Sequence, residues 1–180
     1  MVQGDTELTS EKLDYLIEED LAQFRGVVVQ LRNKQDFVLL KSGFERPKLS
    51  YVVRKCEDKT GQLLAICNGV QGSGIVYMRS RRKCEELASL LSANGVSASY
   101  YHAGLSSDER EIRQQAWKKD EIRVMVCTNA FGMGIDKPDV RFVVHLGLTD
   151  SPEAYFQEAG RAGRDGRQAW AVMLWNSYDI

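Results

Sequence analysis

The chain has 180 residues, of which 43% are apolar and 27% are charged, and its formal net charge at pH 7 is -1. This composition is that of a globular domain with one sizeable core, and a net charge so near zero does not by itself indicate a nucleic-acid partner. The longest apolar runs, such as residues 169–175, are far too short to span a bilayer, and the polar, acidic first residues lack the pattern of a signal peptide.

The first 42 residues form the least readable part of the chain. Apolar residues between Leu13 and Leu21 recur at the spacing of one helical face, and acidic residues fill much of the remainder. We therefore predict an amphipathic helix over residues 9–23. We describe residues 1–42 as a helical N-terminal segment without chemistry of its own, and residues 43–180 as one domain.

From residue 43 onward, strands and helices are expected to alternate. Apolar or β-branched runs predict strands at residues 49–53, 74–78, 97–101, 122–127, 141–145 and 169–175. Helical patterns lie between them, at residues 60–67, 84–91, 106–119 and from 152 onward. Ser106 with Glu109 has the spacing of a capping box, and Ser151 before Pro152 is a typical helix start.

This alternation predicts an α/β fold. Near-continuous apolar strands separated by amphipathic helices indicate a mostly parallel sheet that is covered by helices on both faces, in three layers. In open sheets of this kind, ligands bind at the loops beyond the carboxyl ends of the strands. We therefore expect the chemically informative residues at that edge, where four polar clusters are candidates.

The first two clusters follow predicted strands and could bind phosphate. Four of the five residues from Arg79 to Lys83 are cationic, and they lie at a helix start, where free backbone N–H groups favour an anion. Because cations here oppose the helix dipole, a phosphate backbone is one reason for their presence, and a solvated basic turn is the alternative. His102 is either a second phosphate contact or a structural loop histidine.

The third cluster runs from Cys127 to Asp139 and begins at the end of another predicted strand. Gly132 and Gly134 allow a neighbouring backbone to approach closely. Thr128 and Asn129 offer short polar contacts, and Asp136 can accept hydrogen bonds, for instance from a ribose hydroxyl. The alternative is an ordinary glycine-containing loop.

The fourth cluster, residues 157–167, contains Arg161 and Arg164 three positions apart. On a helix turn, side chains at this spacing lie side by side. Guanidinium groups suit the charge that develops on a transferring phosphoryl group, so the pair has the character of arginine fingers. The alternative is a surface patch in which Glu158 and Asp165 pair with the arginines.

Two further features have structural interpretations. His145 ends an apolar strand, and we interpret it as a packed residue rather than a catalyst. No two cysteines have a C-x-x-C spacing, so we predict no metal site and expect reduced, buried side chains. The cysteines are Cys56, Cys67, Cys84 and Cys127.

The clusters together resemble the motifs of the RecQ family of ATP-dependent DNA helicases. Residues 130–145 resemble motif V of that family, and residues 157–166, which read QEAGRAGRDG, resemble motif VI. The weaker matches are residues 74–82 to motif IV, 101–105 to the YHAGL motif, and 43–51 to the opening of the second motor lobe. This resemblance implies a RecA-like lobe with a P-loop NTPase-like fold, in a protein that couples ATP hydrolysis to 3′→5′ movement on DNA.

The resemblance also implies roles for individual residues. The motif VI match places Arg161, Arg164 and Gln157 opposite the γ-phosphate of ATP, and the motif V match places Asp136 and Gly134 near the nucleotide. The residues implied to contact the nucleic-acid backbone are Arg79, Ser80, Arg81, His102, Thr128 and Asn129.

The sequence lacks a G-x-x-x-x-G-K-[ST] phosphate loop and a D-E-x-H motif. In the RecQ family both lie on the first RecA-like lobe, which we therefore expect as a partner that holds most of the ATP and Mg²⁺, with residues 1–42 as its end or a linker. By itself the chain is expected to have no ATPase activity.

The resemblance implies single-stranded DNA and duplex junctions as the other partners, in repair, recombination or replication. It implies an intracellular protein, in the cytoplasm or nucleoid of a bacterium or the nucleus of a eukaryote. Two alternatives stay open: a nucleic-acid-binding lobe without a motor role, and an RNA helicase lobe.

Overall fold

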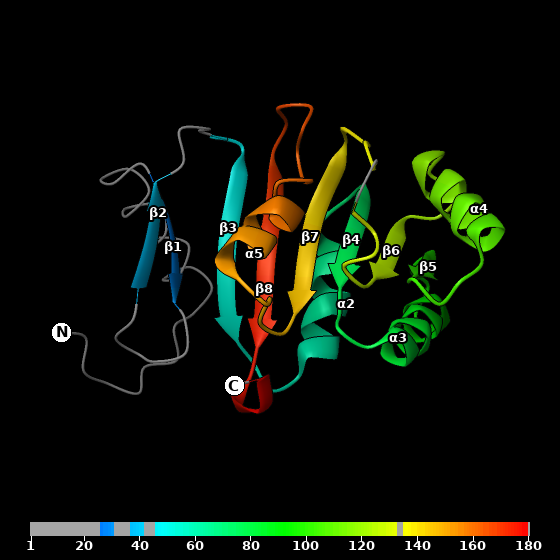
Figure 1. The fold of residues 1–180 in the computed structure, drawn as a ribbon, viewed down its shortest axis with the longest axis horizontal. Coiled ribbons are helices and arrows are strands. Elements are labelled where there is room, and N and C mark those ends of the chain that lie inside the picture. Colours follow the sequence, from blue (N-terminus) through cyan, green and yellow to red (C-terminus); the bar gives the residue numbers. More distant parts are fainter. Residues whose placement is uncertain (1–25, 31–36, 42–45, 133–134, 180) are drawn as a thin grey trace.

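A six-stranded sheet forms the centre of the computed structural model, which describes residues 26–30, 37–41, 46–132 and 135–179 (Figure 1). The strands are β3 (Leu49–Lys55), β4 (Ser73–Tyr77), β5 (Ala98–Tyr101), β6 (Val124–Cys127), β7 (Val140–Leu146) and β8 (Ala169–Trp175). Their order is β3-β8-β7-β4-β6-β5, and every neighbouring pair is parallel. The predicted parallel sheet is therefore confirmed.

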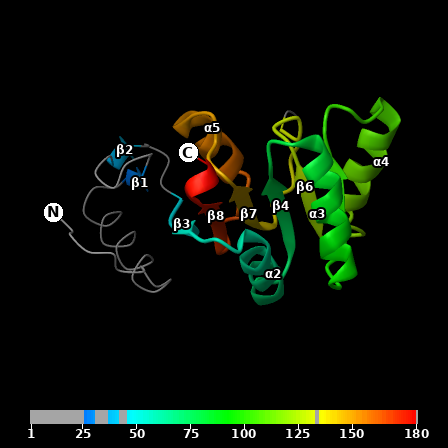
Figure 2. The ribbon, with the colours of Figure 1, turned by 90° about the horizontal axis from the view of Figure 1, so that it is seen from below.

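Helices cover both faces of this sheet. They are α2 (Lys59–Gly69), α3 (Arg81–Ala93), α4 (Ser107–Lys118) and α5 (Pro152–Ala159), and a short 3₁₀ helix, η1 (Ser177–Asp179), follows β8. Figure 2 shows α2 and α5 on opposite sides of the sheet. Because side chains alternate along each strand, the sheet has two cores: Leu63 of α2 belongs to one, and Tyr155 of α5 belongs to the other. The three-layer α/β/α arrangement of a RecA-like lobe follows.

The predicted helix starts are present in atomic detail. Ser106 accepts a hydrogen bond from the backbone N–H of Glu109, whose carboxylate accepts one from the N–H of Ser106, so the capping box is complete. Ser151 accepts a hydrogen bond of 3.1 Å from the N–H of Ala154, and Pro152 begins α5. These short-range signals fix where α4 and α5 begin.

The expectation for the N-terminal segment is only partly testable. The helix predicted over residues 9–23 lies outside the described residues. The helical description of residues 1–42 is wrong for two stretches, β1 (Gly26–Gln30) and β2 (Phe37–Lys41), which pair as antiparallel strands. The reason is local, since runs such as Val27–Val29 favour extended backbone.

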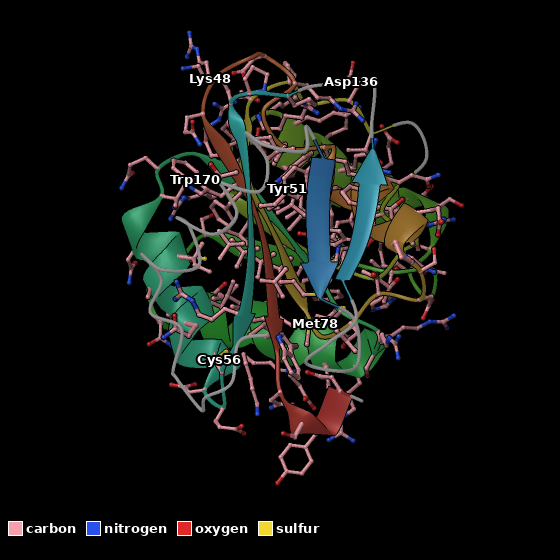
Figure 3. All side chains as sticks on the ribbon, turned by 90° about the vertical axis from the view of Figure 1, so that its left-hand side faces the viewer. Lys48, Tyr51, Cys56, Met78, Asp136 and Trp170 are labelled. Atoms are coloured by element: carbon pink, nitrogen blue, oxygen red, sulfur yellow. The ribbon has the colours of Figure 1, made fainter. Side chains whose placement is uncertain are left out.

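The connection from β7 to β8 carries residues 160–168 to an unexpected edge of the sheet. Helix α5 runs back along the sheet face, so the turn that follows it reaches the amino-terminal ends of the strands. There the N–H of Gly163 donates to the carbonyl of Val140 at the start of β7, over 2.8 Å. Figure 3 shows Lys48 and Asp136 at this edge, and Met78 and Cys56 at the opposite, carboxyl-terminal edge.

Candidate functional site

The basic turn after β4 is exposed and only loosely paired. Ser80 caps α3, since its hydroxyl accepts from the N–H of Lys83 over 3.4 Å. Arg79 pairs with Asp150 at 2.9 Å and Arg82 with Glu86 at 2.7 Å, both at the surface, and Arg81 is exposed. Exposed ion pairs contribute little, so a phosphate can replace these carboxylates at small cost.

His102 is buried, with only 4% of its surface exposed. Its Nε2 lies 2.9 Å from a carboxylate oxygen of Glu85, and its Nδ1 accepts a hydrogen bond of 3.2 Å from the N–H of Gly104. Both ring nitrogens therefore have partners within the chain. This geometry favours the structural alternative, in which His102 fixes the turn before α4.

The two polar residues at the start of the loop after β6, Thr128 and Asn129, differ in their exposure to solvent. Thr128 is buried and its hydroxyl accepts from the N–H of Ala130 over 3.4 Å, whereas Asn129 is exposed. A Cβ atom at Gly132 would lie 3.1 Å from Nη2 of Arg161, so this glycine leaves room for the arginine. Gly134 lies outside the described residues.

Arg161 lies over the sheet face beside Tyr77, at the carboxyl end of β4. The Tyr77 hydroxyl donates to the carbonyl of Phe131 over 2.9 Å, in a fully buried hydrogen bond. Burial raises the pKa of Tyr77 far above its usual range, and the neighbouring Arg161 opposes that rise only in part. Nε of Arg161 is buried without a hydrogen-bond partner among the described residues. Tyr77 thus stays neutral and connects the loop after β6 to the arginine.

Arg164 occupies a different place from Arg161. The sequence-based expectation that both lie side by side on a helix turn is wrong, because α5 ends at Ala159 and a chain of turns follows, with a φ of +60° at Gly163. Arg164 lies at the amino-terminal edge and pairs with Asp136 at 3.0 Å. Its side chain is 38% exposed and that of Asp136 is 81% exposed, so both are open to a ligand.

The expectation that all informative residues lie at the carboxyl edge is therefore half right. It holds for the basic turn, His102 and Thr128, which directly follow strands. It is wrong for Asp136 and Arg164. The physical reason is that the chain crosses the sheet twice, once between β6 and β7 and once along α5.

The alternative of a simple surface patch is not what the structure shows. Glu158 pairs with His145 at 2.8 Å rather than with an arginine of the motif, and Asp165 pairs with Arg141 at 2.6 Å. The hydrogen bond from Arg141 holds the pKa of Asp165 below its usual range. Gln157 is exposed on α5. The carboxylates nearest in sequence to the two arginines thus have other partners.

His145 is a packed residue, as the sequence indicated. It is 2% exposed, and its ring stacks on that of Tyr77 with centroids 5.1 Å apart. Together with Glu158 it joins the carboxyl end of β7 to α5. The three buried cysteines, Cys67, Cys84 and Cys127, are also packed in the two cores.

The sequence reasoning missed two cations with partners inside the fold, the buried Lys137 and the half-buried Arg46. Nζ of Lys137 lies 3.0 Å from Asp120 and 3.1 Å from Asp139. Its side chain is only 5% exposed, so these carboxylates take the place of solvent around the ammonium group. Arg46 donates two hydrogen bonds to the turn after α5. The acidic residues that flank Lys137 in the sequence, Asp136 and Asp139, were a signal that this lysine is paired. Nothing in the local sequence indicated the contacts of Arg46.

Comparison with known proteins settles the family. The family model described as the helicase conserved C-terminal domain matches residues 57–166. The chain belongs to this family. Among the described residues, the helicase lobe has no group of three or more metal-binding side chains and no helix long and apolar enough to cross a membrane.

The relatives of this helicase lobe are of RecQ type. It is 41% identical over 163 residues to the ATP-dependent helicase SGS1 of Saccharomyces cerevisiae, covering 88% of the chain but 11% of that relative. It is 47% identical over 137 residues to the ATP-dependent DNA helicase RecQ of Pasteurella multocida, covering 76% of the chain and 22% of that relative. The recognition as a RecQ-type lobe is confirmed, and the chain spans only a small part of these relatives.

Solved structures confirm the fold. The Escherichia coli DEAD-box protein SrmB, in its complex with RraA, matches with a TM-score of 0.65 and 27% identity, over 73% of this chain and 78% of that one. The C-terminal domain of the DEAD-box protein Dbp5 matches with a TM-score of 0.61 and 26% identity, over 71% and 76%. The helicase lobe therefore has the RecA-like fold of these C-terminal domains.

Proposed function

We propose that this lobe is the second motor lobe of an ATP-dependent 3′→5′ DNA helicase of RecQ type. The observation that carries the proposal is the placement of Arg161 and Arg164. One guanidinium lies over the sheet face with its Nε unpaired, and the other is open at an edge with Asp136 beside it. Such groups can meet a nucleotide presented by another body without leaving their own fold.

Arg161 and Arg164 would stabilise the charge on the transferring phosphoryl group, and Gln157 would contact the same group from α5. Asp136 would accept a hydrogen bond from the ribose when Arg164 turns from it toward phosphate. The exchange is inexpensive because the Arg164–Asp136 pair is largely exposed. Binding therefore reorganises the surface rather than the core.

The residues present suit only part of the nucleotide site. The described residues offer no cluster of carboxylates or histidines that could hold a metal ion. We propose that Mg²⁺ and most contacts to ATP come from a first RecA-like lobe. When bound, the metal neutralises charge on the phosphates, while this lobe supplies the guanidinium groups.

The basic turn after β4 is the proposed grip on the DNA backbone. Arg79, Ser80 and Arg81 lie together at the start of α3, where the capped helix end favours phosphate. Asn129 is exposed in the loop after the neighbouring strand β6, with Thr128 beneath it. His102 would act indirectly, by holding its turn in place.

The RNA helicase alternative rests on the shared fold with DEAD-box proteins, one of which is named an RNA helicase. The relatives with the higher sequence identities are named DNA helicases. A binding lobe without a motor role leaves the placement of the two arginines unexplained. We therefore favour DNA unwinding, with single-stranded DNA and duplex junctions as substrates, in the repair and recombination of intracellular DNA.

The test is Arg164→Ala in the protein that contains both lobes. Removal of an arginine finger typically lowers turnover by about 10³–10⁵-fold, so DNA-stimulated ATPase and unwinding should be lost while nucleotide binding persists. Arg167→Ala, at an exposed position of the same turn, is the matched control. Turnover of Arg164→Ala near that of the control would reject the proposal, and a comparison of DNA with RNA as ATPase stimulants decides between the two nucleic acids.

A further inference from the structure

The end of α5 is held by a guanidinium group from a distant part of the chain. Nη1 of Arg46 donates a hydrogen bond of 2.6 Å to the carbonyl of Gly160, and Nη2 donates one of 2.6 Å to the carbonyl of Ala162. Arg161 lies between these two carbonyls in the sequence. The backbone that carries the arginine is therefore gripped on both sides.

The chemistry of a helix end explains why an arginine occupies this position. Gly160 caps α5 and Ala162 lies in the turns beyond it, so neither carbonyl is bonded within the helix, and both lie near the negative end of its dipole. The planar guanidinium presents two N–H groups in a fixed fork, which suits two carbonyls at once. An amine would satisfy them less well, since it is a point charge without that geometry.

Arg46 is itself fixed to the edge of the sheet. Its carbonyl accepts a hydrogen bond of 2.9 Å from the N–H of Leu49, at the start of β3, and the carbonyl of Lys48 accepts one of 2.8 Å from Ala169 in β8. Further along β3, Tyr51 packs on α5, with ring centroids 5.8 Å from Phe156. The guanidinium of Arg46 thus fixes the turn after α5 relative to the edge of the sheet.

The turn has little freedom to adopt another path. A Cβ atom added at Gly163 would lie 2.8 Å from that of Ala169 and 2.9 Å from the carbonyl of Arg167. A shallow groove of about 180 Å³ runs along the turn, and both Arg46 and Arg164 line it. Movement of Arg46 would therefore reach Arg164 along the groove, and Arg161 through the carbonyls of the two residues that flank it.

We propose that Arg46 is a positioning residue for the nucleotide-facing turn, acting through the carbonyls of Gly160 and Ala162 on the placement of Arg161 and Arg164. This inference rests on the proposed function of those two arginines. Arg46 lies outside residues 57–166, the part matched by the family model. It touches no substrate, because its fork is directed at the backbone of its own chain.

The test is Arg46→Met in the protein that contains both lobes. Misplacement of a catalytic group by about 1 Å can lower turnover about 100-fold, so we expect kcat for DNA-stimulated ATPase to fall about 10- to 100-fold, with KM for ATP and affinity for DNA unchanged. Arg46→Lys keeps the charge but not the planar fork, so its kcat should lie between that of the wild type and that of Arg46→Met.

A matched control is Arg123→Met. Arg123 donates to the carbonyls of Cys67 and Val70 at the end of α2, over 2.5 and 2.6 Å. Its substitution therefore removes the same kind of hydrogen bonds from a helix on the opposite face of the sheet. Thermal unfolding of each variant gives its folded fraction, and turnover is compared per folded molecule. Arg123→Met should keep kcat. Should Arg46→Met not fold, Arg46→Lys decides by the same comparison.

The double variant Arg46→Met with Arg161→Ala distinguishes positioning from general support. If Arg46 acts through the turn, the double variant should lose clearly less turnover than the two single losses combined, because Arg161 can no longer be misplaced and only the effect on Arg164 remains. Fully additive losses, or Arg46 variants with wild-type kcat beside an inactive Arg161→Ala, would overturn the inference while leaving the proposed function intact. Wild-type turnover in both Arg161→Ala and Arg164→Ala would instead overturn the proposed function itself.

Discussion

At the scale of single residues, Gly132 brings the backbone of the loop after β6 close to Arg161. A Cβ atom there would lie 3.1 Å from Nη2 of the arginine and 3.3 Å from the carbonyl of Asn129. Both contacts are tighter than side chains normally make, and the carbonyl is backbone that cannot easily move. A methyl group would therefore displace the arginine rather than the loop.

We predict that Gly132→Ala lowers ATPase turnover about tenfold or more in the protein that contains both lobes, because a displaced catalytic group loses much of its effect. Gly69→Ala is the control, since a Cβ atom at Gly69 meets nothing within 4 Å. Steady-state ATPase assays of the two variants test the prediction. Equal turnover in both would show that Arg161 has room to spare.

At the scale of elements, α4 depends on its capped start. Its first turn carries Asp108 and Glu109, and hydrogen bonds from Ser106 hold the pKa of Glu109 below its usual range. Only Trp117 of this helix is fully buried. Local interactions must therefore contribute much of its stability.

We predict that Ser106→Ala lowers the free energy of unfolding by about 1 kcal/mol, the usual effect of removing an N-cap. Ser107→Ala, at the first helical position, should have a smaller effect, because its hydroxyl makes only an exposed 3.4 Å contact with Arg110. Urea unfolding of both variants measures the difference. The capping box would be unimportant if the two variants were equally stable.

The other end of α4 is joined to the loop before β7 by Lys137. Hydrogen bonds from Lys137 and then Ser73 hold the pKa of Asp120 below its usual value of 3.8. A carboxylate with a lowered folded-state pKa stabilises the fold fully above its unfolded-state pKa, and this contribution is lost as the pH falls through the folded-state pKa. The connection should therefore weaken only in acid.

We predict that the chain loses stability as the pH falls below about 4, and that Asp120→Asn makes this loss shallower. Glu57→Gln, at an exposed position before α2, should retain the wild-type slope. Urea unfolding between pH 2.5 and 6 provides the measurement. The same slope in Asp120→Asn and wild type would contradict the assigned role of Asp120.

At the scale of the whole molecule, positive charge for nucleic acid is local. The net charge is -1, and the exposed cations proposed to contact DNA lie on the turn after β4. Binding through a few phosphate contacts is weak and depends steeply on salt. The isolated lobe should therefore bind DNA only at low ionic strength.

We predict that Arg79→Ala with Arg81→Ala reduces the slope of log affinity against log salt by about 1.4 on single-stranded DNA, since each lost phosphate contact removes about 0.7. Arg167→Ala, at the opposite edge, should leave that slope unchanged. Fluorescence anisotropy with a labelled strand across a salt series measures it. An unaltered slope in the double variant would remove the turn from the DNA interface.

The sequence predicted the sheet, its helices and the motif residues, because each depends on neighbours close in the chain. Apolar runs and caps located α4 and α5 to within a residue or two. What it could not predict depends on contacts between distant residues: Arg46 reaches carbonyls 114 and 116 positions away. The separation of Arg161 from Arg164 arises in turns after α5, where spacing along the chain no longer determines direction.

The parallel sheet itself carries a last implication. Arg164 and the basic turn occupy opposite rims of one hydrogen-bonded slab, in which β4 pairs with both β6 and β7. Continuous hydrogen bonding across these strands joins the two edges in one rigid unit. Under the proposed function, a shift at the nucleotide would therefore move the DNA contacts as part of the same rigid body, without any rearrangement inside the lobe.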